Sequence, residues 1–534
     1  MKKEGAPVTA DPAGEAKSIH PDLTFDAPRS PRRPEREAVP HSISRQALVL
    51  ITGRGLAAAF TFFIPVVLAR HLSPSDYGTF KQIFLIYSSL FLILPFGIIQ
   101  SLYYFIPKEP QRIRTYLVQS FVFLQGSGLV AILFLLAFRK SIALYLNNPE
   151  LEGYLLQLGV FIFFMLSSSY FEALLISSQK INQASLLGFA SEAGKTVCML
   201  IPLLIFKELS YLMWGMNLFA LFRFLFVLVY IIKEYHLSWS DFEWGAFRQQ
   251  LLYSIPFGLG VILQVTQDKF HNYVVAYRFS AAIFAVYSVG MFQLPILDLI
   301  YTPMSQLLIV RMTALRQKGT RQEIISLWYD ITKKMAMVFF PMIVILQLLA
   351  RDLVVFLFTE TYLPSVPIFR MTLLTFLTAI LLTDGVLRAY ADTHFILKMN
   401  LVKLALTLIL VFPFLKWFGL QGGIITLVIV LALAKMAMLW KIAQLIPLSF
   451  SELLPWRDLL NIAIFSFLCS IPVALVREIH FSSNFVGLSV SVTVYSLFYL
   501  VFLFMSHLIS FDEKREVARI FRRIGQRIPA VSKL

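Results

Sequence analysis

The chain has 534 residues, of which 58% are hydrophobic and 15% are charged, and its mean hydropathy is +0.72. This composition excludes an ordinary soluble domain, because too few polar side chains remain to cover a surface exposed to water. The net charge of +16 would be compatible with nucleic acid. Contact of Lys and Arg with anionic membrane lipids already explains that charge, so no nucleic-acid partner is expected.

Roughly fourteen apolar stretches of about twenty residues fill the chain from Ala47 to His507, each long enough to cross a ~30 Å hydrocarbon layer as a helix. We therefore predict an all-α integral membrane protein. In chain order, the predicted helices are 47–69, 82–105, 116–138, 154–177, 184–206, 209–232, 251–275, 281–309, 335–358, 367–390, 399–416, 422–443, 459–476 and 484–508.

These helices group as six, six and two. The chain is predicted to begin with a disordered cytoplasmic tail (1–45), a six-helix bundle (46–232) and an interfacial cytoplasmic linker (233–250). A second six-helix bundle (251–445), two additional helices (459–508) and a basic cytoplasmic tail (509–534) follow. About thirty Lys and Arg fall on the side of the tails against about eight on the opposite side. Both termini are therefore predicted to be cytoplasmic.

Two six-helix halves raise the question of an internal repeat. The segments Leu72–Phe80 and Phe279–Tyr287 each form a short turn that enters a helix through a small residue and an aromatic. Two turns of this kind also share such residues by chance. The similarity leaves both explanations open.

The sequence contains no sign of a metal site, a disulfide or a bound cofactor. Cys198 and Cys469 lie in apolar stretches, and the eight histidines lack ligand spacing. The segment 188–196 is close to a phosphate-binding loop, but it has five residues between its glycines where the motif requires four, and it lies inside an apolar helix. No catalytic residue is predicted, and the chain is not expected to be an enzyme.

The segments Arg54–Leu56 and Leu68–Gly78 resemble the opening of polysaccharide transporter family proteins. Ser254–Phe257 and Ala285–Tyr287 resemble the second half of that family, which contains the O-antigen and lipid-linked oligosaccharide flippases. The family belongs to the multidrug/oligosaccharidyl-lipid/polysaccharide exporter superfamily. The resemblance implies two six-helix bundles that face each other across a central cavity, with two extra helices at the end.

Charged residues inside the predicted helices are candidates for function, because a charge at the centre of a membrane helix costs roughly 2.5–3.5 kcal/mol. Glu192 and Lys195 are three residues apart, and Asp384 and Arg388 are four apart. Each pair can neutralise itself on one helical face, so an internal ion pair is the favoured interpretation of both.

Arg54, Arg223, Lys403 and Lys435 have no acidic residue three or four positions away. We predict that they bind the substrate, since a guanidinium group can donate two parallel hydrogen bonds to a phosphate. Arg54 and Arg223 are the first choices, because the first and sixth helices line the cavity in the resembled superfamily. Arg54 could instead extend to the cytoplasmic interface, and Arg223 could pair with another helix. Lys403 and Lys435 are weaker candidates, because a long side chain near a helix end reaches the head groups.

The seventh predicted helix carries a dense polar segment, in which Gln264, Asp268 and His271 share one face. An acid and an imidazole there suit ion coupling or a gate, although the segment could equally be a wet outer helix end. Lys269 belongs to the same segment and points elsewhere. Glu172 and Asp298 also lack cations on their own helices, so each could bind a coupling ion or pair with an arginine.

Together these observations predict a flippase that moves a polyprenyl-diphosphate-linked oligosaccharide across the bacterial inner membrane, for O-antigen, capsule or exopolysaccharide synthesis. The carrier specificity is implied by the resemblance. Expected partners are this substrate, anionic lipids, a polysaccharide polymerase and glycosyltransferases. The alternatives are a cation-coupled multidrug antiporter of the same superfamily, an integral-membrane polysaccharide-biosynthesis enzyme, and a scaffold whose basic tails recruit partners.

Overall fold

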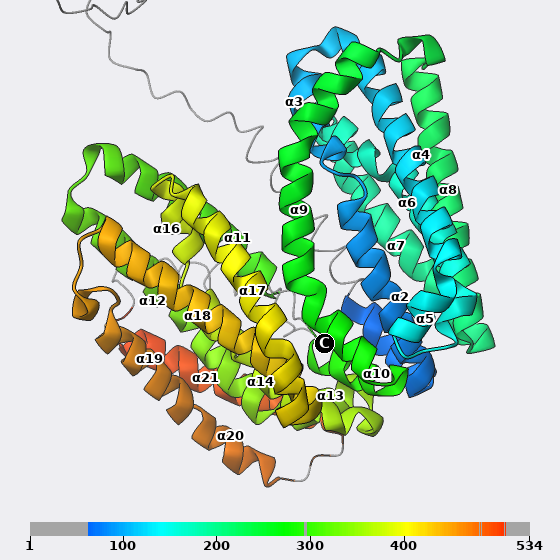
Figure 1. The fold of residues 1–534 in the computed structure, drawn as a ribbon. Coiled ribbons are helices and arrows are strands. Elements are labelled where there is room, and N and C mark those ends of the chain that lie inside the picture. Colours follow the sequence, from blue (N-terminus) through cyan, green and yellow to red (C-terminus); the bar gives the residue numbers. More distant parts are fainter. Residues whose placement is uncertain (1–61, 293–295, 480, 482, 507, 509–534) are drawn as a thin grey trace, which may run out of the picture. The chain divides into compact units, whose positions relative to one another are not determined.

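The computed structural model describes residues 62–292, 296–479, 481, 483–506 and 508 (Figure 1). These residues form helices and connecting turns and contain no strand. Ten helical stretches among them are long and apolar enough to cross a membrane, and one of these, Thr393–Leu445, holds two successive helices. The structure thus confirms an all-α membrane protein. The predicted tails and most of the first predicted helix lie outside the described residues.

The first half begins with the short apolar helix Phe62–His71. It continues with α2 (Pro74–Ile93), α3 (Ile98–Lys108), α4 (Ile113–Ala137), α5 (Arg139–Tyr145), α6 (Leu151–Ser177), α7 (Ile181–Phe206) and α8 (Leu209–Tyr235).

The second half begins with a helix of 35 residues, α9 (Trp244–Arg278). It continues with α10 (Ala281–Gly290), α11 (Ile296–Lys318), α12 (Arg321–Leu348), α13 (Ala350–Phe358), the 3-10 segment η3 (Glu360–Ser365), α14 (Val366–Leu373), α15 (Thr375–Ala379), α16 (Thr383–Ala389), α17 (Thr393–Phe418) and α18 (Gly422–Leu445). The last helices are α19 (Trp456–Leu468), α20 (Ser470–Arg477) and α21 (Asn484–Met505).

The order of elements in the first half recurs in the second half. A long helix followed by a short one occurs as α4–α5 and again as α12–α13, and the final helix pairs α7–α8 and α17–α18 each pack together. The contact of α3 with α6 is matched by that of α11 with α16. This agreement favours an internal repeat over chance similarity.

The two similar turns, in Leu72–Phe80 and Phe279–Tyr287, lead into α2 and α10, and these two helices pack on each other. Ser73 caps α2, where its side chain accepts a hydrogen bond from the Asp76 amide, and Ser280 precedes α10. The helices approach so closely that a Cβ atom added at Gly78 would lie 1.8 Å from the carbonyl oxygen of Ala281. Only glycine permits this approach at position 78.

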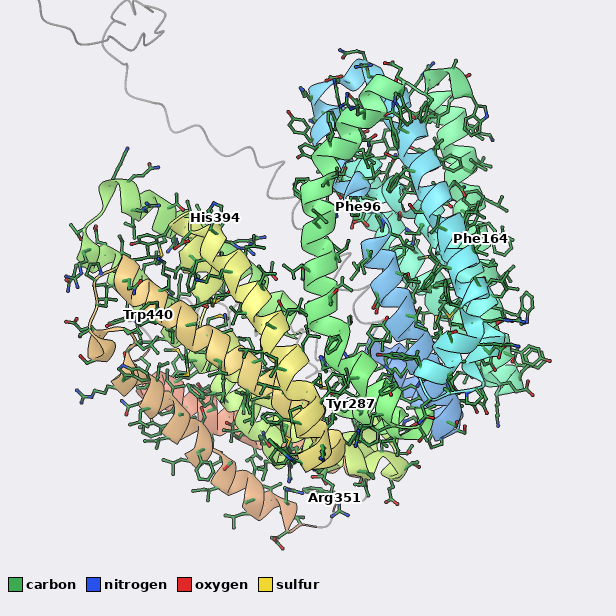
Figure 2. The ribbon with its side chains drawn as sticks, in the orientation of Figure 1. Phe96, Phe164, Tyr287, Arg351, His394 and Trp440 are labelled. Atoms are coloured by element: carbon green, nitrogen blue, oxygen red, sulfur yellow. The ribbon has the colours of Figure 1, made fainter. Side chains whose placement is uncertain are left out.

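Several predicted helices differ from the observed ones in their bounds. The predicted helix 82–105 starts earlier, at Pro74, and is interrupted between α2 and α3, where Phe96 and Gly97 have positive φ. The Phe96 ring lies against α9 (Figure 2), since a Cβ added at Gly258 would be 2.7 Å from it. The predicted helices 281–309 and 367–390 are also divided, into α10–α11 and α14–α16.

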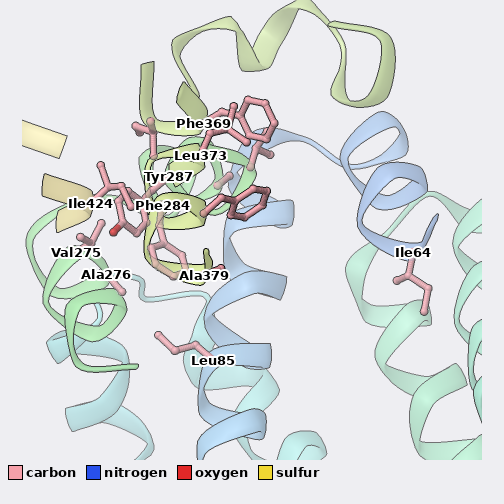
Figure 3. Close-up of a cluster of buried hydrophobic side chains, with 14 of the residues drawn as sticks. Ile64, Leu85, Val275, Ala276, Phe284, Tyr287, Phe369, Leu373, Ala379 and Ile424 are labelled. Atoms are coloured by element: carbon pink, nitrogen blue, oxygen red, sulfur yellow. The ribbon is translucent and has the colours of Figure 1, made fainter. Parts of the chain in front are cut away.

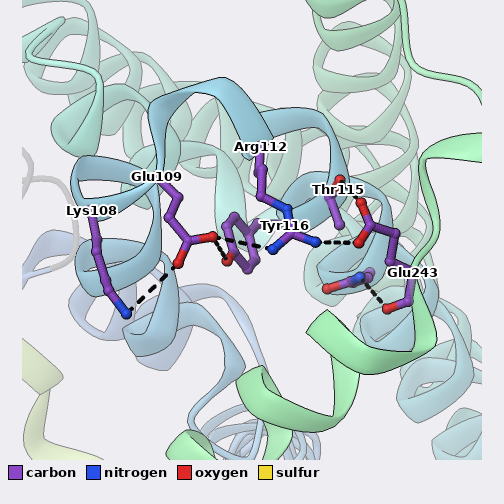
Figure 4. A network of polar contacts seen from close by, with 7 residues as sticks. Lys108, Glu109, Arg112, Thr115, Tyr116 and Glu243 are labelled. Carbon is purple, nitrogen blue, oxygen red and sulfur yellow. Dashed lines mark hydrogen bonds and ion pairs between the residues drawn. The ribbon is translucent and has the colours of Figure 1, made fainter.

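The predicted linker 233–250 is mostly helical, because α8 continues to Tyr235 and α9 already starts at Trp244. A polar network attaches this region to the α3–α4 connection (Figure 4). The Arg112 guanidinium bonds both Glu109 and Glu243, and the Tyr116 hydroxyl donates to Glu109 at 2.8 Å. That hydrogen bond lowers the pKa of Glu109, so the network is present above the ordinary carboxyl pKa and weakens as the pH falls through the lowered value.

The largest apolar core contains residues of both halves, and part of it is shown in Figure 3. Leu85 of α2 joins Val275 of α9, Tyr287 of α10 and Phe369 of α14 in this cluster. A separate small core, which includes Val473 and Tyr495, packs α20 and α21 against α12. The predicted additional helices therefore have their own packing surface on the second half.

Candidate functional site

A cavity of about 330 Å³ lies within the second half, among helices α11, α15, α16, α17 and α18. Three charged side chains line it, and the polar hydroxyl groups of Tyr301, Thr375 and Thr378 come from the surrounding helices. The charged residues are Asp384, Lys403 and Lys435. The structure therefore brings two of the predicted substrate-binding residues, Lys403 and Lys435, to one cavity.

Lys435 forms an ion pair with Asp384 on a neighbouring helix. Its ammonium group lies 3.1 Å from Asp384 Oδ1 and also donates to the Leu381 carbonyl and the Thr383 hydroxyl, each at 3.0 Å. The predicted ion pair of Asp384 with Arg388 on the same helix is therefore wrong, because the partner of Asp384 is Lys435. The placement of Lys435 near a helix end is also wrong, because this residue lies near the middle of α18.

Lys403 differs from Lys435 in lacking such a partner. It is half-buried on α17, and its ammonium group makes no hydrogen bond or ion pair with any described residue. Asp384 and Asp268 lie within electrostatic range of it, as does Lys435. A cation that is held at membrane depth without a direct partner is available to a ligand.

Asp268 and His271, which were predicted to share one helical face, have different environments in the structure. Asp268 is exposed on α9, where Gln267 donates to it at 3.4 Å and Lys403 lies within electrostatic range. His271 is buried, and neither of its ring nitrogens has a hydrogen-bond partner among the described residues. Its ring lies 6.3 Å from that of Tyr287. Asp268 therefore lies near the charges around the cavity, whereas His271 is buried beside Tyr287.

Lys81 was missed by sequence reasoning. It lies on α2, 5.3 Å from the centre of the Tyr77 ring, and Lys269 on α9 is within electrostatic range. The predicted helix 82–105 leaves Lys81 outside the helix, in the connection that precedes it. Ser73 followed by Pro74 is a typical helix start and would have placed Lys81 inside the helix.

Arg223 lies in the first half among acidic residues of other helices. Its guanidinium is half-buried beside Met165, its Nε has no hydrogen-bond partner among the described residues, and Glu172 and Glu192 lie within electrostatic range. Glu192 also pairs with Lys195 at 2.6 Å, as predicted. This arrangement agrees with the alternative that Arg223 has partners on other helices.

The charged positions of the two halves correspond. In each half, an acid lies near the end of the fourth membrane helix, which is α6 in the first half and α14–α16 in the second. A charged residue lies in the first half of the fifth helix (α7 and α17), and a cation lies near the middle of the sixth (α8 and α18). The corresponding residues are Glu172 and Asp384, Glu192 and Lys403, and Arg223 and Lys435. Two of the predicted substrate-binding residues, Arg223 and Lys435, are thus at equivalent positions.

The remaining predicted site residues cannot be placed in this arrangement. Arg54 lies outside the described residues, and so does the side chain of Asp298 on α11. Within the described part of the chain, no group of three or more His, Cys, Asp or Glu residues could hold a metal ion.

A family model described as polysaccharide biosynthesis protein matches residues 67–367, which is more than half of the chain. The chain belongs to this polysaccharide biosynthesis protein family. The match covers the N-terminal turn of α2 and extends into α14, so it includes Lys81, Arg223 and the α9 charges. A search of curated protein sequences found no significant match.

Solved structures with a similar fold include a flippase and membrane transporters. A structure of the lipid II flippase MurJ in an inward closed conformation has a TM-score of 0.67 at 15% identity, and the alignment covers 86% of this chain and 98% of MurJ. An inward-facing multidrug resistance MATE family transporter of the MOP superfamily has a TM-score of 0.57 at 15% identity, with 74% and 97% covered. A MOP superfamily transporter from Pyrococcus furiosus has a TM-score of 0.53 at 14% identity, with 76% and 95% covered. At these identities the likeness establishes the fold.

Proposed function

We propose that this polysaccharide biosynthesis protein is a flippase that carries a polyprenyl-diphosphate-linked oligosaccharide from the cytoplasmic to the outer leaflet of the bacterial inner membrane. The product would serve synthesis of O-antigen, capsule or exopolysaccharide. The proposal combines the family membership with the fold of membrane transporters, among them a flippase for another lipid-linked substrate. It makes both termini cytoplasmic and assigns no catalytic step to the chain.

The observation that carries the proposal is the excess of cations over acids around the cavity. Two lysines and one aspartate line it, and the lysine without a direct partner is Lys403. Because an isolated cation at membrane depth is unfavourable, an anionic ligand would stabilise it. A diphosphate offers several strong acceptor oxygens for ammonium groups.

Lys81 and Lys269 support the same conclusion from a second place. The positive charges of Lys81 on α2 and Lys269 on α9 repel each other, and an anion bound between them would offset that repulsion. We propose that Lys81 joins Lys403 and Lys435 in binding the head group, while the lipid tail stays in the bilayer. Arg54 and Arg223 are proposed to contact the substrate from the first half.

Directional transport also needs a driving force, because a substrate by itself only shifts the populations of existing conformations. We propose that Asp268 takes part in ion coupling or gating, with Lys269, His271, Glu172 and Asp298 as further members of this group. Asp268 is the strongest of these, since it is exposed and close to Lys403.

The multidrug antiporter alternative predicts a cavity dominated by acids and aromatics. The cavity in the second half has the opposite balance of charge, which favours an anionic cargo. An enzyme alternative would require a change in the substrate's covalent structure, which the experiment below detects.

The test is transport of a defined, fluorescent lipid-linked glycan by the purified full-length protein in liposomes. We expect the glycan to reach the opposite leaflet chemically unchanged, and a variant with alanine at both Lys403 and Lys435 to lose most of this activity. A chemically altered glycan would favour the enzyme, and export of hydrophobic cations without glycan movement would favour the antiporter.

A further inference from the structure

A second cavity, of about 270 Å³, lies where α20 and α21 are connected. It is lined by Leu349 and Asp352 from the start of α13, by Arg477 at the end of α20, and by the first turns of α21 down to Ser491. The cavity shares no residue with the one that holds Lys403 and Lys435. The transport proposal therefore leaves it without a role.

The position of this cavity identifies the kind of ligand that reaches it. Trp456–Arg477 and Asn484–Met505 are both long and apolar enough to cross a membrane, and the cavity lies at the short connection between them. The connection between two spans lies at the depth of the phospholipid head groups. A cavity of this volume holds a head group rather than a whole lipid.

The charged groups of the cavity form a zwitterionic pair. Arg477 Nη2 lies 2.9 Å from Asp352 Oδ2, and Arg477 Nη1 donates to the Leu348 carbonyl at 3.1 Å. Both charged side chains remain about one-third exposed, at 35% for Arg477 and 36% for Asp352. The remaining guanidinium hydrogens and the second carboxylate oxygen are available to a ligand that carries both signs of charge.

The start of α21 adds donors for an anion on the same side. Ser483 caps the helix by accepting from the Val486 amide, and the first amides of a helix have no intrahelical acceptor. These amides, with the positive end of the helix dipole, favour a phosphate.

Ser491 provides an independent indication of a ligand. Its side chain lines the cavity and is only 2% exposed, yet its hydroxyl makes no hydrogen bond with any described residue. Most buried serines in this protein bond the carbonyl four or three residues earlier, as Ser466 does at 2.7 Å. A hydroxyl of a buried residue that opens onto a polar cavity without a partner is expected to bond a ligand or an ordered water there.

We propose that this cavity binds the phosphoethanolamine head group of a membrane phospholipid. The phosphate accepts from Arg477 and from the first amides of α21, and the ammonium group donates to Asp352. Ser491 bonds the head group from the floor of the cavity. The bound lipid would hold α20 and α21 against α13, separately from the transported substrate.

The test uses native mass spectrometry of the purified full-length protein with phosphatidylethanolamine, phosphatidylcholine or soluble phosphoethanolamine. Choline has no N–H donor for Asp352, so we expect phosphatidylethanolamine to bind about tenfold more tightly than phosphatidylcholine. Equal binding of the two lipids would overturn the proposal. Binding of soluble phosphoethanolamine as tightly as the lipid would overturn the assignment to a lipid.

Three variants complete the experiment. Ser491→Leu fills the cavity without touching the ion pair, and we expect it to abolish the preference for phosphatidylethanolamine. Asp352→Asn should make the two lipids bind equally. Arg351→Gln, at an exposed neighbouring position that does not line the cavity (Figure 2), should behave as the unmodified protein. A Ser491→Leu variant that stays folded and retains the preference would refute the site.

Discussion

The ion pair between Lys435 and Asp384 allows a structural role to be separated from a substrate-binding role. Replacement of Lys435 by Met removes three hydrogen bonds and leaves the Asp384 carboxylate without its cation. Breaking a fully buried pair costs about 3–5 kcal/mol. The Asp384 side chain is 38% exposed and keeps some water, so we expect a loss of about 1–3 kcal/mol in the free energy of unfolding.

The double variant Lys435→Met, Asp384→Asn should regain part of that stability, because the uncompensated charge is gone. We expect a coupling energy of about 1–2 kcal/mol between the two positions in a double-mutant cycle. Thermal unfolding of the purified protein measures stability, and liposome transport of a lipid-linked glycan measures function. If Lys435 contacts the cargo, the double variant is stable but stays inactive.

A matched control is available on the same helix. Lys441 pairs with Asp392 at 3.4 Å but does not line the cavity, so Lys441→Met should reduce stability without a specific effect on transport. Recovery of transport together with stability in the double variant would assign Lys435 to the fold alone. An unchanged unfolding midpoint in the Lys435→Met single variant would refute the reasoning about the ion pair itself.

Further predictions concern three other positions. Lys403→Ala should reduce transport about tenfold or more with little change in stability, whereas Lys398→Ala, exposed on the same helix, should not, and equal effects would contradict a ligand role. Gly78→Ala should destabilise the α2–α10 contact by about 1–3 kcal/mol, measured by thermal unfolding, while Gly126→Ala, with nothing within 4 Å of its Cβ, serves as the control. Asp268→Asn should flatten the pH dependence of transport if Asp268 couples protons, and an unchanged profile would return it to a structural role.

Hydropathy predicted the ten stretches that are long and apolar enough to cross a membrane, but not where several of them start. The apolar runs locate the part of each helix in lipid, and α6, α7 and α18 lie close to the predicted bounds. Helices α2 and α12 start eight and fourteen residues earlier than predicted, at Pro74 and Arg321. Both have polar first turns capped by Ser73 and Thr320, which a search for apolar runs leaves out.

The candidate site was only partly predictable, because its geometry depends on contacts between helices. The residue types and helices of Lys403 and Lys435 could be read from the sequence, since charges stand out in apolar stretches. The partner of Asp384 lies 51 residues away on α18, whereas local spacing favoured Arg388. Spacing within one helix gives no information about such pairs.

The correspondence of charged positions between the two halves changes the ranking of the candidate substrate-binding residues. Arg223 was preferred from the sequence, but Glu172 and Glu192 lie within range of it, and Lys195 pairs with Glu192. Among the described residues, that cluster therefore contains as many acids as cations. The equivalent cluster in the second half has Lys403 where the first half has Glu192, and its cavity is lined by two cations and one acid. Since the two clusters occupy equivalent helices, this excess of one cation makes the second half the stronger attractor for a phosphate, and Lys403 is the residue whose loss should affect cargo binding most directly.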